Sequence, residues 1–194
     1  MRKTALELYN INIKDVKLSQ AWFDEKISAM NRNRVTPNAL MLKDGVDQLT
    51  STLMPSKLYS FYYWPAGADE LPHYDIFPLV FPFAKTDTTF TGLNMHYLDY
   101  PMRFRLFKEL LKISGATNLT EESKMKINWQ SLRGISKLAP AQACIKQYLF
   151  SQVKSPFLEI RPTEWTTAML LPTARFRKQT NEQVWQQTKK IRSW

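Results

Sequence analysis

The sequence is poor in cysteine, in histidine and in long apolar runs, and each shortage excludes a class of protein. Its 194 residues include one cysteine, Cys144, so an intramolecular disulfide cannot form and a disulfide-stapled secreted scaffold is excluded. The longest strongly apolar stretch, residues 76–83, is interrupted by Pro78 and Pro82 and is far too short to cross a bilayer. The first ten residues are charged and lack an apolar segment, so no signal peptide is expected. We therefore expect a protein of a reducing compartment that does not act at a membrane.

Motifs that hold phosphates or metal ions are also missing. The five glycines are scattered, and neither GxxxxGK nor GxGxxG occurs. The two histidines, His73 and His96, could be combined with Cys144 and with Asp75 and Asp99 into a metal site, but neither HxxxH nor CxxC spacing is present. We expect no metal site and no cofactor, and we expect both histidines to form hydrogen bonds in loops or at strand ends.

No group of residues predicts catalysis. Cys144 lies between Ala143 and Ile145 in a predicted helix, which is typical of a buried structural cysteine rather than of a nucleophile. The paired carboxylates at 69–70 and 121–122 fall in predicted loops, where adjacent acids are usually solvated. We expect the protein not to be an enzyme. A nuclease that processes DNA ends stays open as an alternative, because residues 69–99 hold several acids and Lys85.

Apolar and aromatic residues, in contrast, are plentiful. They make up 44% and 13% of the chain, which is enough to fill one compact core. The local patterns predict an α+β fold, with a small antiparallel β-sheet, packed helices, N-terminal helices and an extended C-terminal arm. We divide the chain into an N-terminal helical arm (1–53), an α+β core domain (54–172) and a basic C-terminal arm (173–194).

The expected elements follow from hydrophobic spacing and from the positions of proline and glycine. Helices are expected over 14–32, 37–49, 101–113 and 140–152, and a helical turn over 163–169. Strands are expected over 57–64, 76–84, 89–97 and 154–160, with a hairpin turn at 85–88. Gly92 within the third strand indicates a bulge or a close backbone contact. The run of rings from Tyr59 to Trp64 could stack on nucleic-acid bases, but strand alternation favours placing half of the rings in the core.

Positive charge is concentrated in the second half of the chain. The net charge is +10, with ten Lys/Arg and eleven Asp/Glu in residues 1–100 but seventeen Lys/Arg and six Asp/Glu in residues 101–194. This asymmetry predicts a polyanionic partner or an acidic protein surface. The residues expected to bind DNA or an acidic partner are Arg103, Arg105, Lys108, Lys112, Lys124, Lys126, Arg133 and Lys137.

The last twenty residues combine cations with aromatic rings. Such a segment is typical of an arm that docks on a neighbouring chain and folds as it binds. The residues expected to form this partner-docking arm are Arg175, Arg177, Lys178, Trp185, Lys189, Lys190, Arg192 and Trp194.

An ordered series of motifs resembles a family of small virion proteins from tailed phages of the T-even type. The series consists of MPSKLYSFYY (54–63), LPHYDIFPLV (71–80), TGLNMHYL (91–98), CIKQYL (144–149), EW (164–165), LLPT (170–173) and VW (184–185). The resemblance covers about residues 30–190. It departs from the family pattern at Asp99 and Tyr100, where a proline-rich turn is common, and this leaves the start of the helix at 101 open.

The resemblance implies a protein that is made in the host cytoplasm and carried in the virion, such as a DNA end protector or a head-completion or tail protein. We therefore expect a structural protein at the neck, the DNA end or the tail machinery. Its expected partners are other virion proteins, in an oligomeric assembly, and double-stranded DNA. The first alternative is a baseplate or tail component that binds only protein, and the second is the DNA-end nuclease. The family brings no catalytic residues to this chain.

Overall fold

The fold was examined in a computed structural model, which describes residues 48–55, 57–104, 130, 132–134, 139–161, 165–170 and 173–192. The expected helix over 14–32 and nearly all of the one over 37–49 lie outside the described residues, as does most of the helix over 101–113. The elements are β1 (Leu49–Thr50), β2 (Leu58–Ser60), β3 (Tyr74–Asp75), β4 (Leu79–Lys85), β5 (Thr89–Asn94), η1 (Met95–Tyr97), α6 (Ala139–Gln142), β6 (Ile145–Leu149), η2 (Phe150–Gln152), β7 (Phe157–Ile160), α7 (Trp165–Leu170), β8 (Phe176–Arg177) and α8 (Asn181–Arg192).

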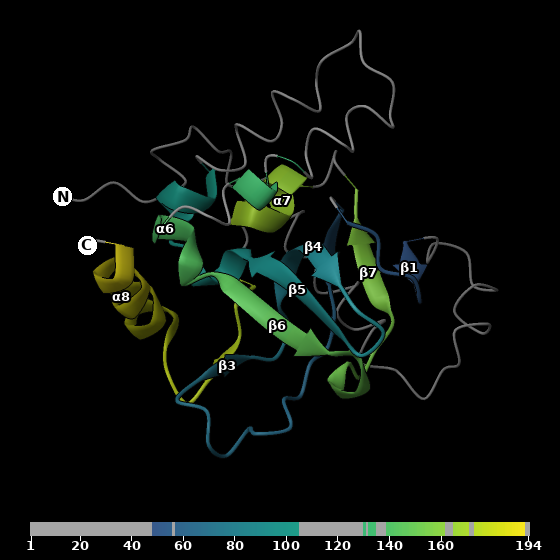
Figure 1. The fold of residues 1–194 in the computed structure, drawn as a ribbon. Coiled ribbons are helices and arrows are strands. Elements are labelled where there is room, and N and C mark those ends of the chain that lie inside the picture. Colours follow the sequence, from purple (N-terminus) through teal and green to yellow (C-terminus); the bar gives the residue numbers. More distant parts are fainter. Residues whose placement is uncertain are drawn as a thin grey trace, which may run out of the picture.

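A six-stranded antiparallel sheet forms the centre of the described fold (Figure 1). Its strand order is β1-β7-β2-β4-β5-β6, and β3 and β8 form a separate two-stranded ribbon. The sheet and the helices packed with it confirm the expected α+β class. Residues on both sides of the predicted domain boundaries take part, since β1 pairs with β7 and β8 pairs with β3. The division into three segments itself stays a prediction.

Alternation along the strands supplies the two faces of the sheet with different side chains. Leu58, Leu79 and Leu158 belong to one buried cluster, which also contains Trp165 of α7 and Val184 of α8. The next residue along β2 and β4, or the preceding one along β7, points to the opposite face. There the side chains form a second, largely aromatic cluster: Leu53, Tyr59, Phe61, Tyr63, Val80, Phe90, Tyr148 and Phe157. Most of the aromatic run over 59–64 is therefore core, and only Trp64 is largely exposed.

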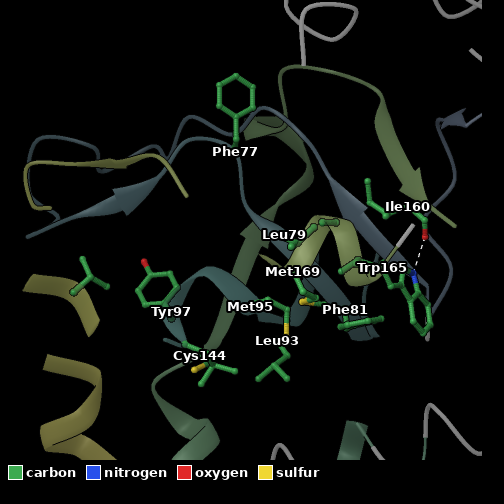
Figure 2. Close-up of a cluster of buried hydrophobic side chains, with 14 of the residues drawn as sticks. Phe77, Leu79, Phe81, Leu93, Met95, Tyr97, Cys144, Ile160, Trp165 and Met169 are labelled. Atoms are coloured by element: carbon green, nitrogen blue, oxygen red, sulfur yellow. Dashed lines mark hydrogen bonds between the residues drawn. The ribbon is translucent and has the colours of Figure 1, made fainter. Parts of the chain in front are cut away.

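Helix α7 closes the first face of the sheet (Figure 2). The Trp165 indole Nε1–H donates to the Ile160 carbonyl oxygen at 2.7 Å, and its ring meets Phe81 edge-on at 5.2 Å. Burying a tryptophan with its N–H satisfied is strongly stabilising. The helical turn expected over 163–169 is confirmed from Trp165 onward.

The β4–β5 hairpin agrees with its sequence pattern. Thr86 N–H donates to the Thr89 carbonyl oxygen at 2.8 Å, which confirms the turn expected at 85–88. The ladder is irregular between Pro82 and Ala84, opposite Gly92. A Cβ atom on Gly92 would collide with Val80 Cγ1 and would lie 2.8 Å from the Phe81 carbonyl oxygen. The close backbone contact expected at this glycine is confirmed.

Two expectations about the second half are wrong. The helix expected over 140–152 is only the short α6, followed by strand β6. Residues 145–149 pair with residues 89–93 of β5, and this pairing outweighs the local helical pattern. The extended arm expected over 173–194 is instead β8 and α8 in its described part. Val184 and Thr188 lie one helical turn apart and are both buried, which gives α8 a narrow face that packs on the core.

Candidate nucleic-acid interface

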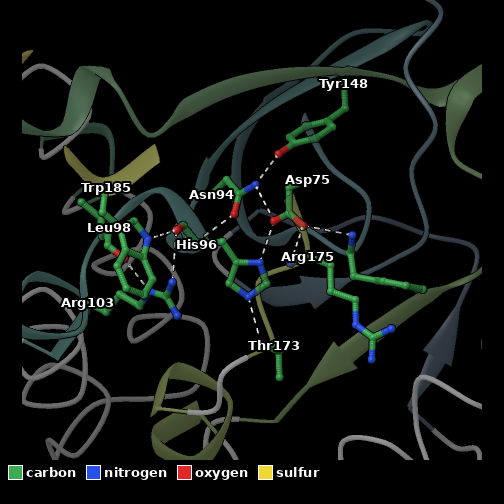
Figure 3. A network of polar contacts seen from close by, with 10 residues as sticks. Asp75, Asn94, His96, Leu98, Arg103, Tyr148, Thr173, Arg175 and Trp185 are labelled. Atoms are coloured by element: carbon green, nitrogen blue, oxygen red, sulfur yellow. Dashed lines mark hydrogen bonds and ion pairs between the residues drawn. The ribbon is translucent and has the colours of Figure 1, made fainter. Parts of the chain in front are cut away.

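A buried polar network joins three separate parts of the chain (Figure 3). His96 Nδ1 lies 2.6 Å from Asp75 Oδ2, and His96 Nε2 lies 3.0 Å from Thr173 Oγ1. Asp75 comes from β3, His96 follows β5 in η1, and Thr173 precedes β8. All three residues are buried. The network therefore ties the β3–β8 ribbon to the main sheet.

Asp75 accepts four hydrogen bonds. Its Oδ1 atom accepts from the backbone N–H groups of Phe77 and Arg175, and its Oδ2 atom accepts from Asn94 Nδ2 and His96 Nδ1. Asn94 Nδ2 also donates to the Tyr148 hydroxyl at 3.1 Å. Each carboxylate oxygen thus has its two lone pairs used, as a buried carboxylate requires.

Burial lowers the pKa of His96, and the attraction of Asp75 only partly offsets that effect. The ring is therefore neutral near pH 7, and the short contact is a hydrogen bond rather than a salt bridge. Since Asp75 can only accept, Nδ1 carries the proton and Nε2 accepts from the Thr173 hydroxyl. The hydrogen bonding expected for His96 at a strand end is confirmed.

The series Asp75–His96–Thr173 has the composition of an orienter–base–nucleophile triad. The Thr173 residue, however, is only 7% exposed, and neither it nor His96 lines the pocket described below. A nucleophile must reach its substrate, so we assign this network a structural role. Among the described residues, no group of three or more His, Cys, Asp or Glu side chains could hold a metal ion.

Arg103 is buried rather than solvent-facing. Its Nε atom donates to the Leu98 carbonyl oxygen at 2.7 Å and its Nη2 atom donates to the His96 carbonyl oxygen at 3.1 Å. Its guanidinium lies 4.9 Å from the ring centroid of Tyr100 and 5.4 Å from that of Trp185. Burial lowers the pKa of Arg103 to about 10, so it remains charged at neutral pH. This cation joins α8 to the core instead of forming part of an exposed basic face.

Trp185 of α8 docks within its own chain. Its indole Nε1–H donates to the His96 carbonyl oxygen at 2.8 Å, and its ring meets Tyr100 at 5.2 Å. Lys189, one turn further along α8, forms an ion pair with Asp99 at 3.1 Å. Trp185 thus fixes α8 to the core, where the sequence had suggested contact with a neighbouring chain.

The exposed cations near the C-terminus lie on β8, on the residues that flank β8, and on α8. The described side chains of this group are Arg175, Arg177, Lys178, Lys189 and Lys190, and all five are exposed. Lys178 Nζ also donates to the carbonyl oxygens of Asp69 and Leu71 at 2.7 and 2.9 Å. Residues 175–192 contain six Lys/Arg and one acid, Glu182. We call residues 175–192 the basic C-terminal segment.

The other candidates predicted from the sequence are placed only in part. Arg133 is exposed, and Arg192 ends α8, where its side chain lies outside the described part of the chain. Arg105, Lys108, Lys112, Lys124, Lys126, Lys137 and Trp194 lie outside the described residues altogether. The structure therefore describes most of the C-terminal candidates and few of the earlier group, and the role of both groups stays a prediction.

A pocket of about 300 Å³ lies between the loop after β2, the β3 strand and the two strands β5 and β6. It is lined by Tyr63, Pro65, Leu71, Pro72, His73, Tyr74, Asp75, Asn94, Tyr97, Lys146, Gln147 and Tyr148. Lys146 Nζ lies 4.1 Å from the centre of the Tyr97 ring. The sequence did not single out Lys146, because residues 140–152 were expected to be a helix and no local pattern placed this lysine beside an aromatic pocket.

The comparisons with known proteins give one positive result. No curated protein sequence and no solved structure matches the chain. No helix among the described residues is long and apolar enough to span a membrane. The family model described as phage T4 terminal DNA protecting protein matches residues 7–190, which is nearly the whole chain. The chain therefore belongs to the family of the phage T4 terminal DNA protecting protein, as the resemblance of its motifs predicted.

Proposed function

We propose that this protein binds the ends of linear double-stranded phage DNA and shields them from attack. The family description names terminal DNA as what is protected, and the chain matches that family over residues 7–190. The observation that carries the proposal is the positive charge of the basic C-terminal segment. Residues 175–192 contain six Lys/Arg and only one acid. A polyanion such as DNA is the partner that best suits this excess of positive charge.

The fold supports a binding role rather than a chemical one. The segment is held rigidly, since Val184 is buried and Trp185 is hydrogen-bonded to the His96 carbonyl oxygen. Cations on a fixed helix and strand lose less conformational freedom on binding than cations on a mobile chain. The triad-like group noted above, Asp75–His96–Thr173, is buried. A protein that protects a DNA end by covering it needs only to bind, and these features are those of a binding protein.

The test compares linear and closed circular duplex DNA of one sequence. The full-length protein is titrated with labelled linear DNA at increasing salt, with unlabelled linear or circular DNA as competitor. We expect binding to weaken steeply with salt, because each phosphate contact releases counterions. We also expect linear competitor to be the more effective. An absence of binding at low salt, or equal competition by the two forms, would refute the proposal.

A digestion assay tests protection itself. Linear DNA is incubated with the protein and then treated with an exonuclease that needs a free end. We expect the linear DNA to survive in proportion to the amount of protein bound. The variant tested beside the native protein carries Lys190→Gln with Arg177→Gln, which removes two exposed cations of the basic C-terminal segment. We expect weaker protection from this variant, with unchanged thermal unfolding.

The same experiment separates the alternatives. Degradation of linear or circular DNA by the protein alone, in the presence of magnesium or manganese, would favour a nuclease. Assembly into particles without any affinity for DNA would favour a component that binds only protein. Docking on neighbouring virion proteins, at the neck or tail, is part of our proposal. Its test is whether α8 variants that still fold fail to enter assembled particles.

A further inference from the structure

We propose that the pocket between β3, β5 and β6 holds an unpaired terminal nucleotide of a DNA end, with the base against its tyrosine walls and a phosphate on Lys146. This inference rests on the proposed function and states how the protein would distinguish an end from the interior of a duplex. The volume of the pocket, about 300 Å³, is in the range of pockets that hold small ligands.

The walls of the pocket suit a nucleobase. Four tyrosines line it, Tyr63, Tyr74, Tyr97 and Tyr148, together with two prolines. Flat aromatic walls stack on bases of any sequence, because every base has a π-face. The exposed ring of Trp64 packs on Tyr74 at 5.8 Å and extends the aromatic surface beyond the pocket. An aromatic pocket of this kind would accept a base only after it has left the duplex stack.

The polar groups of the pocket are mainly donors. Tyr63 accepts a hydrogen bond from Leu149 N–H, and Tyr148 accepts one from Asn94, so each hydroxyl keeps a proton that no described residue accepts. His73 has a buried Nδ1 atom without a hydrogen-bond partner among the described residues, and this atom can donate or accept according to the tautomer of the ring. Asp75, the only acid in the lining, already accepts four hydrogen bonds. A ligand rich in acceptors, such as the carbonyl and ring-nitrogen edges of a base, matches these donors.

Lys146 supplies the charge. Its ammonium lies over the Tyr97 ring, and no carboxylate of the described residues forms an ion pair with it. Burial lowers the pKa of Lys146, which means that its charged form is partly desolvated. An anion placed beside it would restore the lost stabilisation. The carboxylate of Asp75, which also lines the pocket, disfavours a phosphate beside it, so the phosphate is expected at the lysine and the base on the tyrosines.

The pocket is continuous with the basic C-terminal segment. Tyr74 of the lining pairs directly with Arg177 of β8, and Lys178 Nζ is hydrogen-bonded to the Leu71 carbonyl oxygen at 2.9 Å. Exposed cations therefore begin at the edge of the pocket. A DNA strand whose last nucleotide enters the pocket would place its next phosphates among them. This continuity favours a nucleic-acid end over a peptide, which has no repeated negative charge.

The test uses a labelled DNA hairpin, which has a single free end. The native protein is titrated with two forms of it that carry the same terminal phosphate, one blunt and one with an unpaired terminal nucleotide. We expect the unpaired end to bind tighter by roughly tenfold, as stacking of one base would provide. Lys146→Gln should reduce this preference measurably, because the contact with the terminal phosphate is lost while the tyrosine walls remain. Lys154→Gln removes an exposed lysine outside the pocket lining and should keep it.

A second measurement does not depend on a variant. A deoxynucleoside monophosphate, added to the native protein, should displace the unpaired end and shift the NMR signals of Tyr97 and Lys146. If displacement occurs without these shifts, or if an acidic peptide displaces the end equally well, the assignment of the pocket is wrong.

The outcomes separate this inference from the proposed function. Native protein that prefers linear to circular DNA, with Lys146→Gln unchanged in its preference for an unpaired nucleotide, would overturn the pocket and leave end binding intact. An equal loss of affinity for circular and linear DNA in Lys146→Gln would also overturn it, because the lysine would then act on any duplex. Native protein without preference for ends would overturn both.

Discussion

His96 Nδ1 lies 2.6 Å from Asp75 Oδ2, and the two side chains are 0% and 1% exposed. This contact links the end of the β5 strand to the β3–β8 ribbon, which carries part of the pocket and part of the basic C-terminal segment. A buried hydrogen bond of this kind is costly to break on one side only, because the remaining partner stays desolvated. The position of the candidate interface therefore depends on residues that do not themselves touch a partner.

Asp75→Ala should destabilise the fold strongly. The change leaves four donors without their acceptor, two of them backbone N–H groups. We expect the free energy of unfolding to fall by about 4 kcal/mol, measured by urea denaturation. Asp87→Ala, at an exposed site in the β4–β5 turn, is the control and should change it by less than about 0.5 kcal/mol. Equal effects of the two changes would show that the network contributes no stability.

Acid should weaken the fold through its histidines. Burial lowers the pKa of both His73 and His96, so the unfolded chain takes up protons at a higher pH than the folded one. Their contribution to stability is therefore complete above the unfolded histidine pKa of about 6.5 and is lost as the pH falls below it.

Measured unfolding free energies should decline from pH 7 toward pH 5, by up to about 1.4 kcal/mol per pH unit for each histidine. His96→Gln should flatten this decline, because it removes the more deeply buried of the two rings. A native protein whose stability does not change over this interval would contradict the assignment of a neutral His96.

Trp185 should determine whether α8 stays docked. Trp185→Phe keeps an aromatic ring beside Arg103 and loses the hydrogen bond to the His96 carbonyl oxygen, so a cost of about 1 kcal/mol is expected. Trp185→Ala also loses the ring and should cost about 3 kcal/mol. Hydrogen exchange of the α8 amides is the measurement. Exchange should be faster in the alanine variant than in the phenylalanine variant, and unaltered exchange in both would mean that other contacts hold the helix.

Gly92→Ala should strain the β4–β5 hairpin. The new methyl group would meet the Val80 side chain and the Phe81 carbonyl oxygen, and the backbone atom cannot rotate away. We expect a loss of about 2 kcal/mol in thermal or urea unfolding. Gly134→Ala is the matched control, because a Cβ atom there meets nothing within 4 Å and the residue is helical. It should be neutral or stabilising by up to about 1 kcal/mol.

Local patterns predicted those elements whose signals are contained in a few neighbouring residues. The turn at 85–88 and the close contact at Gly92 depend on short-range backbone geometry, and both are confirmed. A strand was also predicted over 154–160, and the structure has β7 over Phe157–Ile160. The β6 strand was not, since its apolar pattern resembles a helix and only pairing with β5 makes it extended.

The residues of the candidate site also could not be placed from local sequence patterns. His96 was predicted to form hydrogen bonds at a strand end, but its partners Asp75 and Thr173 are 21 and 77 residues away in the sequence. Arg103 was expected from its charge to bind DNA or an acidic partner. Its burial depends on Tyr100 and Trp185, and Trp185 comes from a helix at the other end of the described chain.

By itself, the sequence determined the α+β class, the excess of positive charge in the second half and the family, because composition, short motifs and net charge do not depend on how the chain folds. Only the tertiary structure decided which cations face solvent, which one is buried, and that Lys146 stands beside four tyrosines in a pocket. The physical reason is that burial, desolvation and hydrogen bonding between distant residues arise from tertiary contacts such as those of β3 with β8, β6 with β5, and α8 with η1. No local stretch of sequence contains that packing.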